Sequence, residues 1–378
     1  MIDNILLAPY YMALKFRHFL YDKGIRKSRK APVPTISIGN VTVGGTGKTP
    51  HTEMLLRLLA SDPQWAGKNI AVLSRGYKRK TKGFQQVTAE GPASAFGDEP
   101  LQIKRKFPRT VVAVDKNRMQ GCSFLADPEK LKSSKKARKC LDKDLAAQDL
   151  IILDDALQYR PLIPTVSIVL MDYSRPVFND RLMPLGRLRD LPERALKADI
   201  IIITKSPAYL DDSDKAEYVS EKLHLKGFNP QTCKAETRKG KHIGIFFTKI
   251  KYCGIETIFP EGEHRYSYAK QAILVTGIAN DRPLAMYLSD TYKIIGKLSF
   301  PDHHSFTDAD IKKIGRLSRA HPTAALITTE KDSQRFLDCK KIPETLRQKM
   351  FRVPITVDFL SDEEKTVFTS LLDRKLRG

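Results

Sequence analysis

The stretch Ser37-Ile-Gly-Asn-Val-Thr-Val-Gly-Gly-Thr-Gly-Lys-Thr-Pro50 decides how this chain folds. An apolar run at residues 33–38 leads into its loop, and a helix-like run follows at residues 51–59. A glycine-rich loop between a strand and a helix can turn its backbone N–H groups toward phosphate oxygens, and the helix N-terminus adds its positive end. The stretch therefore predicts a phosphate-binding loop. A plain hairpin turn is disfavoured, because it needs no Lys-Thr pair at this spacing.

Within this loop the last two polar residues carry the chemistry. Lys48 is expected to reach the β- and γ-phosphates of a nucleotide, and the Thr49 hydroxyl is expected to contact Mg²⁺. The residues predicted to hold the nucleotide are Thr42, Val43, Gly44, Gly45, Thr46, Gly47, Lys48 and Thr49. The usual pattern for such loops has glycine where this chain has Thr42.

The length and the net charge of the chain limit the classes of protein to which it can belong. A chain of 378 residues exceeds the size that one core usually supports, so about two domains are expected. Lys+Arg 65 against Asp+Glu 43 gives a net charge of +22, which suggests nucleic acid, an anionic membrane surface or a phosphorylated substrate as partner. The five cysteines are scattered without a C-x-x-C pair, which fits a reducing cytoplasm and indicates neither a disulfide framework nor a zinc site.

Residues 5–20 predict an amphipathic helix. Met12, Phe16, Phe19 and Leu20 fall on one face, and a basic segment follows at residues 23–30. The apolar part precedes the basic part, which is the reverse of the order in a signal peptide. Two interpretations stay open: an interfacial helix on anionic lipid, and a helix that packs on the protein's own core. No apolar segment approaches the roughly 20 residues needed to span a bilayer.

Apolar runs alternate with helical stretches through the first 235 residues, which predicts βαβ units and a parallel sheet. The expected strands are residues 35–38, 70–73, 110–114, 150–153, 167–171 and 199–203. Short β-like pieces follow, and a second alternating block begins at Ala272. The predicted division is an N-terminal helix at 1–30, a core at 31–235, a linker at 236–271 and a smaller α/β domain at 272–378.

Two acidic residues end one of these strands. Four apolar residues precede Asp154 and Asp155, and Gln158 follows in the next turn. In open α/β sheets, ligands bind at the carboxyl ends of the strands. Paired carboxylates beside a phosphate loop match the element that orders Mg²⁺ directly or through water.

Two further motifs leave their roles open on local grounds. Asp98 and Glu99 precede a helix-like run, where acidic residues also serve as helix caps. Phe300-Pro-Asp-His-His304 places an acid and two imidazoles in one loop, and both a structural pair and a metal ligand set agree with that pattern.

Taken in order, these motifs resemble the tetraacyldisaccharide 4′-kinase family, the lipid A 4′-kinases of Gram-negative bacteria. The matching segments are Gly39-Asn40 with Gly44–Pro50, Ser74–Tyr77, Gly97–Pro100, Asp154–Gln158, Pro184–Asp190, Phe300–His304 and Thr328–Asp332. The family's loop also lacks glycine at the position of Thr42. Seven motifs in one order are more specific than any one of them.

The resemblance implies a P-loop NTPase-like α/β core, a smaller C-terminal α/β domain and a two-stranded linker. It implies Mg²⁺-dependent, in-line transfer of the ATP γ-phosphate to the 4′-hydroxyl of a tetraacyldisaccharide 1-phosphate. The expected partners are this lipid-linked glucosamine disaccharide and the anionic cytoplasmic face of the bacterial inner membrane, where the protein would be peripheral. Neither nucleic acid nor an obligate protein partner is expected.

The resemblance also assigns residues. Asp98 and His303 form the acid–imidazole general base, with His304 as the second choice for the imidazole, and Lys48 takes part in catalysis. The implied metal ligands are Thr49, Asp154, Asp155 and Gln158, and the residues near phosphate or substrate are Arg75, Tyr77 and Arg189.

Two positions depart from the family pattern. Tyr159 replaces a common histidine, so any role of that histidine is in question in this chain. Asp190 replaces a glutamate and shortens the reach of its carboxylate.

Two other classes of function are alternatives. The charge of +22 allows a P-loop ATPase that acts on nucleic acid, although the basic clusters at 23–30 and 130–139 lack interleaved aromatic residues. A membrane-associated ATP-binding adaptor is the non-enzymatic alternative. A GTPase is disfavoured, because Pro207 stands where a guanine-reading loop has an acid.

Overall fold

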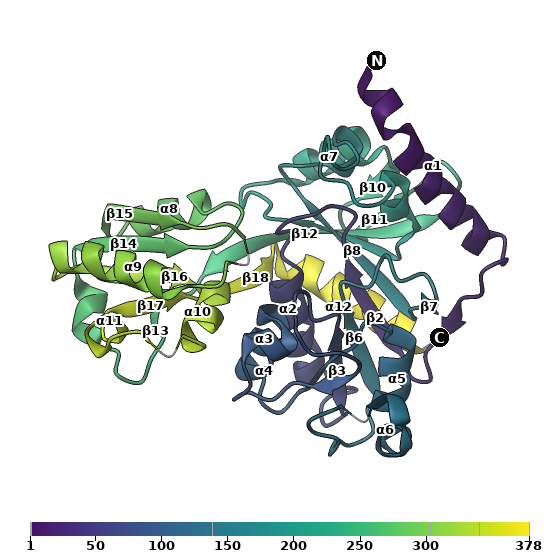
Figure 1. The fold of residues 1–378 in the computed structure, drawn as a ribbon. Coiled ribbons are helices and arrows are strands. Elements are labelled where there is room, and N and C mark those ends of the chain that lie inside the picture. Colours follow the sequence, from purple (N-terminus) through teal and green to yellow (C-terminus); the bar gives the residue numbers. More distant parts are fainter. Residues whose placement is uncertain (1, 138, 303, 340, 378) are drawn as a thin grey trace.

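The computed structural model describes residues 2–137, 139–302, 304–339 and 341–377. Figure 1 shows a larger and a smaller lobe that are joined by the strands β12 (His242–Tyr252) and β18 (Ile355–Phe359). Helix α1 (Ile2–Asp22) lies along the outer side of the larger lobe.

The larger lobe is built on a mainly parallel sheet of eleven strands within the described residues. Its centre consists of β5 (Val111–Val114), β3 (Ile70–Ser74), β6 (Leu150–Asp154), β2 (Thr35–Gly39), β8 (Val166–Asp172) and β9 (Ile200–Thr204), in that spatial order. These strands are runs of Val, Ile and Leu buried on both faces, as parallel sheets require. All the strands predicted for the core are present, and the α/β fold class is confirmed.

The edges of this sheet are antiparallel. The strand β4 (Gln85–Gln86) lies at one edge, and β11 (Lys234–Glu236) and β10 (Lys226–Asn229) follow β12 at the other. A separate parallel pair joins β1 (Arg29–Lys30) to β7 (Leu162–Ile163).

Helices cover both faces of the larger sheet. The helices of one face are α2 (Lys48–Ser61), α3 (Ala93–Phe96), α4 (Asp98–Lys106) and α12 (Asp362–Arg377). The helices of the other face are α1, α5 (Arg118–Ala126), α6 (Pro128–Ser133) and α7 (Asp212–Leu223). The sheet is therefore the middle layer of three.

The smaller lobe repeats this layering around a five-stranded sheet, counted over the described residues. Its strands are β13 (Glu256–Thr257), β17 (Met350–Val353), β16 (Ala325–Thr329), β14 (Gln271–Thr276) and β15 (Lys293–Ser299), in spatial order. Its helices are α8 (Arg282–Ser289), α9 (Asp308–Ala320), α10 (Glu330–Leu337) and α11 (Glu344–Arg347).

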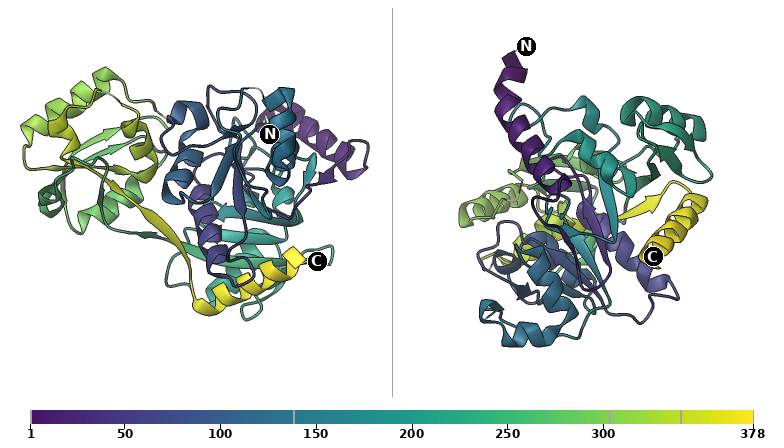
Figure 2. Two further views of the ribbon diagram at one scale, coloured as in Figure 1. Left: turned by 90° about the horizontal axis from the view of Figure 1, so that it is seen from below. Right: turned by 90° about the vertical axis from the view of Figure 1, so that its right-hand side faces the viewer.

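The C-terminal segment corrects one predicted boundary. The sequence assigned residues 272–378 to the second domain, but β18 pairs with β12 and α12 packs on the larger lobe. Figure 2 shows the yellow C-terminal helix against the larger lobe in both views. Phe368 and Leu372 are buried there beside residues of α2. An amphipathic pattern fixes which face of a helix is buried, and it leaves open which lobe receives that face.

Candidate functional site

The phosphate loop connects β2 to α2 at the carboxyl edge of the larger sheet. Gly44 and Gly47 have φ values of 100° and 85°, a left-handed region where a side chain would be strained. Asn40 Nδ2 donates a hydrogen bond to Thr46 Oγ1 at 2.7 Å, and both side chains are buried. The loop is thus closed by its own side chains before α2 begins at Lys48.

Asp154 ends β6, the strand next to the phosphate-loop strand. Ser74 Oγ donates to Asp154 Oδ2 at 3.0 Å, whereas Asp154 Oδ1 is buried without a hydrogen-bond partner in the described part of the chain. Burial, together with the negative charges of Glu99 and Asp155, raises the pKa of the Asp154 carboxyl to about 7. This carboxylate is therefore poised to accept a cation or a proton.

Asp155 has the opposite electrostatic environment. Its Oδ1 lies 3.9 Å from Lys48 Nζ, and its Oδ2 accepts a hydrogen bond from Arg189 Nη1 at 3.0 Å. Arg189 Nη2 also donates to Asp155 Oδ1. Burial opposes ionisation, but the positive charges of Lys48 and Arg189 outweigh it and lower the pKa of Asp155 to about 2. Asp155 is consequently a fixed negative charge.

The residues at this edge fit a divalent cation. The free oxygen of Asp154, the ionised Asp155 and the hydroxyl of Thr49 are oxygen donors of the kind that Mg²⁺ prefers. Among the described residues, no group of three or more His, Cys, Asp and Glu side chains is arranged to hold a metal. The remaining ligands would therefore be phosphate oxygens and water. Gln158, also predicted as a ligand, donates from Nε2 to the Asn40 carbonyl at 2.8 Å.

Asp98 lies where the two lobes meet. It begins α4, its side chain is buried, and its carboxylate accepts a hydrogen bond from Arg335 on α10. Arg335 Nη1 also donates to Asp332 at 2.7 Å. This buried ion network joins the first lobe to the second, and nothing in the sequence motifs singled out Arg335.

The two histidines proposed as bases have different outcomes. His303 lies outside the described residues, so its pairing with Asp98 stays a prediction. His304 Nε2 lies 2.9 Å from Asp310 Oδ2, and its ring stacks on Phe300 at 4.8 Å between centroids. The contacts of His304, the second choice for the base, thus lie within the smaller lobe.

Further ion pairs surround the Asp98 contact. Lys106 Nζ lies 2.7 Å from Glu53 and 2.9 Å from Glu330, which bridges α4 and α2 to α10. Lys331 Nζ lies 3.1 Å from Glu99 of the first lobe, and it also pairs with Asp302 at 3.5 Å. Within the segment Thr328–Asp332, Glu330 and Lys331 thus form ion pairs with the larger lobe.

The predicted substrate residues occupy the same edge. Arg75 and Tyr77 follow β3, and both side chains are exposed beyond Ser74. Arg189 is bound to Asp155, as described above. The sequence could not predict which residues contact Arg75 and Tyr77, because both lie in a loop.

The positions that depart from the family pattern have clear contacts. Tyr159 donates its hydroxyl proton to Asn117 Oδ1 at 2.8 Å. Asp190 Oδ1 lies 2.5 Å from His18 Nε2 on α1, and Arg160 Nη1 lies 3.1 Å from His18 Nδ1. Asp190 therefore attaches the N-terminal helix to the larger lobe.

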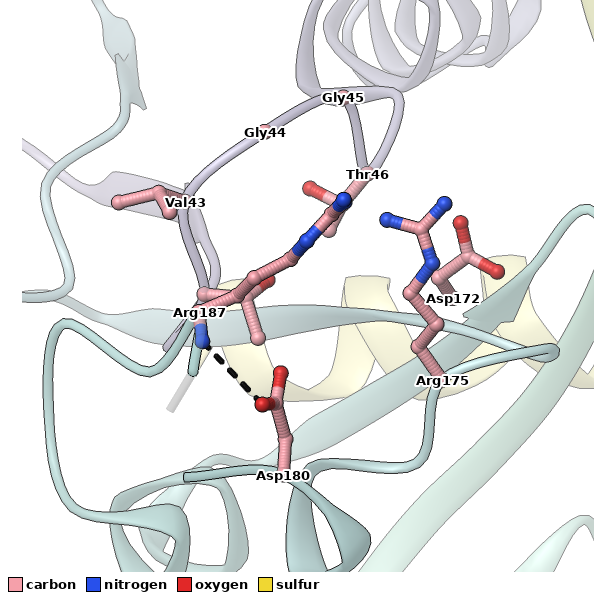
Figure 3. A pocket seen from close by; sticks show the side chains of 9 residues that line it. Val43, Gly44, Gly45, Thr46, Asp172, Arg175, Asp180 and Arg187 are labelled. Carbon is pink, nitrogen blue, oxygen red and sulfur yellow. Dashed lines mark hydrogen bonds between the residues drawn. The ribbon is translucent and has the colours of Figure 1, made fainter. Parts of the chain in front are cut away.

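A pocket opens beside the phosphate loop (Figure 3). It is lined by Thr42, Val43, Gly44, Gly45, Thr46, Asp172, Arg175, Asp180 and Arg187. The Arg187 side chain extends toward Thr46, and Arg175 lies across the pocket from it. A neighbouring hollow of about 670 Å³ continues along Arg175 and Leu185. The lining thus combines the guanidinium groups of Arg175 and Arg187 with the carboxyl groups of Asp172 and Asp180.

Helix α1 has two different faces. Leu7 and Leu14 are buried against the larger lobe, so one face packs on the protein's own core. The opposite face exposes large apolar side chains, with Met12 at 66% and Phe16 at 63% exposure. Within the described residues, no helix has the length and apolar character needed to cross a membrane.

Comparison with known proteins gives consistent matches over the whole length. The model of the family LpxK, described as tetraacyldisaccharide-1-P 4′-kinase, matches residues 4–377. A tetraacyldisaccharide 4′-kinase of Parabacteroides distasonis is 36% identical over 374 residues, which cover 96% of this chain and 92% of that protein. One from Cytophaga hutchinsonii is 35% identical, with coverages of 98% and 97%.

A solved structure has the same fold. It is the crystal structure of the "apo" form of LpxK from Aquifex aeolicus in complex with ATP. The TM-score is 0.65 at 24% identity, and the match covers 100% of both chains.

Proposed function

Because this chain belongs to the tetraacyldisaccharide-1-phosphate 4′-kinase family, we propose that it transfers the γ-phosphate of ATP to the 4′-hydroxyl of a tetraacyldisaccharide 1-phosphate. One observation carries the proposal. Lys48 of the phosphate loop lies beside Asp155 and Arg189 at the carboxyl edge of the sheet, with the free oxygen of Asp154 on the same edge. This arrangement combines a polyphosphate site with the donors for its counter-ion.

Phosphoryl transfer depends mainly on positioning and on neutralising negative charge. The backbone N–H groups of the loop and the Lys48 ammonium group would face the β- and γ-phosphates and stabilise the charge that moves between them. Arg189 is held in place by Asp155, and its guanidinium group would add positive charge near the transferred group.

Thr49, Asp154 and Asp155 would hold Mg²⁺, with Gln158 at the edge of that group. When bound, the ion neutralises the charge of the phosphate oxygens. Asp155 remains ionised for this purpose because Lys48 and Arg189 lower its pKa.

The acceptor hydroxyl requires a base. A sugar hydroxyl is a weak nucleophile, and a positioned base contributes a factor of about 10²–10⁴. Asp98 is at the lobe interface, where it can orient the imidazole of His303 toward the acceptor. Ion pairs between α4 and α10 hold the two lobes together at Asp98. In the proposed reaction His303 would reach the acceptor from the smaller lobe.

The acceptor is a lipid, and α1 offers a surface for it. The exposed Met12, Phe16 and Phe19 side chains are suited to the headgroup boundary of a bilayer, and the charge of +22 favours anionic lipid. The protein would thus work as a peripheral enzyme at the cytoplasmic face of the inner membrane.

The direct test is transfer of one phosphate. Purified protein is incubated with Mg-ATP and the acylated diglucosamine 1-phosphate in detergent, and the position of the added phosphate is determined by mass spectrometry and NMR. One phosphate at the 4′ position is expected, and Lys48→Gln should lower the rate at least a hundredfold while the exposed control Lys68→Gln does not. ATP hydrolysis without phosphorylation of the lipid would contradict the proposal.

A further inference from the structure

His51 lies in the first turn of α2, and its ring is buried. Its Nδ1 is 2.7 Å from the Gly47 carbonyl oxygen, and its Nε2 is 2.9 Å from Thr248 Oγ1. A carbonyl oxygen only accepts, so Nδ1 carries the proton, and in the neutral ring Nε2 accepts from the Thr248 hydroxyl.

Thr248 marks the point at which β12 changes its partner. Residues Gly244–Phe247 pair with β9 in the core sheet, whereas residues Thr248–Tyr252 pair with β18. The strands β12 and β18 run between the larger lobe and the smaller one (Figure 1). The Thr248 carbonyl also accepts a hydrogen bond from Ser206 N at 2.9 Å. Thr248 is therefore the position at which the linker leaves the core.

We propose that His51 is a positioning residue that connects the phosphate loop to the linker between the lobes. The ring bonds to the Gly47 carbonyl through Nδ1 and to Thr248, at the start of the linker, through Nε2. A displacement of the phosphate loop is therefore transmitted to the linker. The inference rests on the proposed function, since it concerns how nucleotide binding and lobe closure are joined in that reaction.

The position of Gly47 makes this connection effective. Gly47 has a left-handed φ and immediately precedes Lys48, so the direction of its carbonyl group is tied to the course of the loop around the phosphates. A nucleotide that changes the backbone conformation of the phosphate loop would displace the Gly47 carbonyl and the His51 ring bonded to it. Through Thr248, this displacement would change the direction of β12 and β18. By linkage, closure of the lobes must then strengthen nucleotide binding by the same factor.

The inference is tested by removing the hydrogen bond between His51 and Thr248 from each side. His51→Asn keeps a donor for the Gly47 carbonyl and loses the group that meets Thr248, and Thr248→Val removes the hydroxyl with little change in shape. Three quantities are measured: the ATP dissociation constant by calorimetry, the ATP-induced decrease in radius of gyration by small-angle scattering, and kcat and KM for phosphoryl transfer.

Each single variant should lose most of the ATP-induced compaction and bind ATP about five- to tenfold more weakly, because closure no longer strengthens nucleotide binding. The kcat for phosphoryl transfer should fall about tenfold. The double variant should be no worse than either single one, because both remove the same contact. Thr248→Ser retains the hydroxyl and should behave as wild type.

Thr204→Val is the matched control. It removes a buried threonine hydroxyl one strand away that has no hydrogen-bond partner among the described residues, and it should leave all three quantities unchanged. The inference is overturned if the variants compact as wild type does, if their losses simply add, or if wild-type protein shows no compaction with ATP. Compaction without lipid phosphorylation would instead remove the proposed function and leave this inference supported.

Discussion

At the scale of single residues, two adjacent aspartate side chains have pKa values that are shifted in opposite directions. Asp154 and Asp155 are adjacent in the chain, yet burial and negative neighbours raise the pKa of the first to about 7, and Lys48 and Arg189 lower that of the second to about 2. The pair therefore provides a fixed negative charge beside an oxygen that lacks a protein partner.

The first prediction concerns Asp154. Asp154→Asn removes a charged oxygen donor from the site proposed for Mg²⁺, so we expect at least a tenfold higher Mg²⁺ concentration for half-maximal activity. Chelation with EDTA should abolish wild-type activity, and added Mg²⁺ should restore it. Asp149→Asn, at an exposed position just before β6, is the control. An unchanged Mg²⁺ requirement in Asp154→Asn would rule out this ligand.

At the scale of elements, the contact between α4 and α10 combines ionic groups that burial alone would make unfavourable. Burial and the charge of Glu330 raise the pKa of Glu53, and the ammonium group of Lys106 opposes this effect. Lys106 is the cation shared by both carboxylates, so its loss would leave like charges facing each other.

The second prediction follows from this arrangement. Lys106→Met should lower the free energy of unfolding by about 3 kcal/mol at pH 7, because it removes the cation that the buried carboxylates of Glu53 and Glu330 share. The loss should shrink as the pH falls toward 5, since protonation of Glu53, whose pKa is already raised, relieves the repulsion. Urea unfolding at both pH values measures this. In the double variant with Glu330→Gln the loss should be smaller, and an equal loss at both pH values would contradict the electrostatic cause.

The third prediction separates the two faces of α1. Phe16→Asp, on the exposed face, should reduce binding to vesicles that contain anionic lipid by about tenfold and leave the melting temperature unchanged. Leu14→Asp, on the buried face, should lower the melting temperature, because it places a charge among apolar side chains. Cosedimentation and calorimetry measure the two effects. Equal vesicle binding by Phe16→Asp and wild type would exclude this face as the membrane contact.

At the scale of the whole molecule, the chain leaves the larger lobe through β12, builds the smaller lobe, and returns through β18 to end in α12 (Figures 1 and 2). Both connections between the lobes therefore lie side by side in one antiparallel ladder. The last helix stabilises the lobe in which the chain began.

The fourth prediction uses this return. Phe368 is fully buried between the larger sheet and α12, so Phe368→Ala should lower the unfolding free energy of the larger lobe by about 3–5 kcal/mol. Hydrogen exchange should show the loss of protection in β2 and β12 rather than in β14 or β16. The exposed control Lys365→Ala should change neither. Loss of protection confined to the smaller lobe would contradict the observed packing.

The sequence predicted those parts of the site that depend on local chemistry. The phosphate loop could be read because glycines with left-handed backbone, the Lys48-Thr49 pair and a following helix must be adjacent in the chain. The pair Asp154-Asp155 could be read because it directly follows a strand. Arg335 and His51 could not, because their functional contacts, with Asp98 and Thr248, join positions 237 and 197 residues apart.

By itself, then, the sequence determined the α/β class, the core strands, the phosphate loop and the family, because strand burial and loop conformation are local requirements of residue type. Only the tertiary structure decided which carboxyl group of Asp154 and Asp155 has the lowered pKa, how Arg335 of α10 pairs with Asp98, and where α12 packs. These properties depend on which distant groups come together at a given depth of burial, since charge interactions and desolvation act through space rather than along the chain.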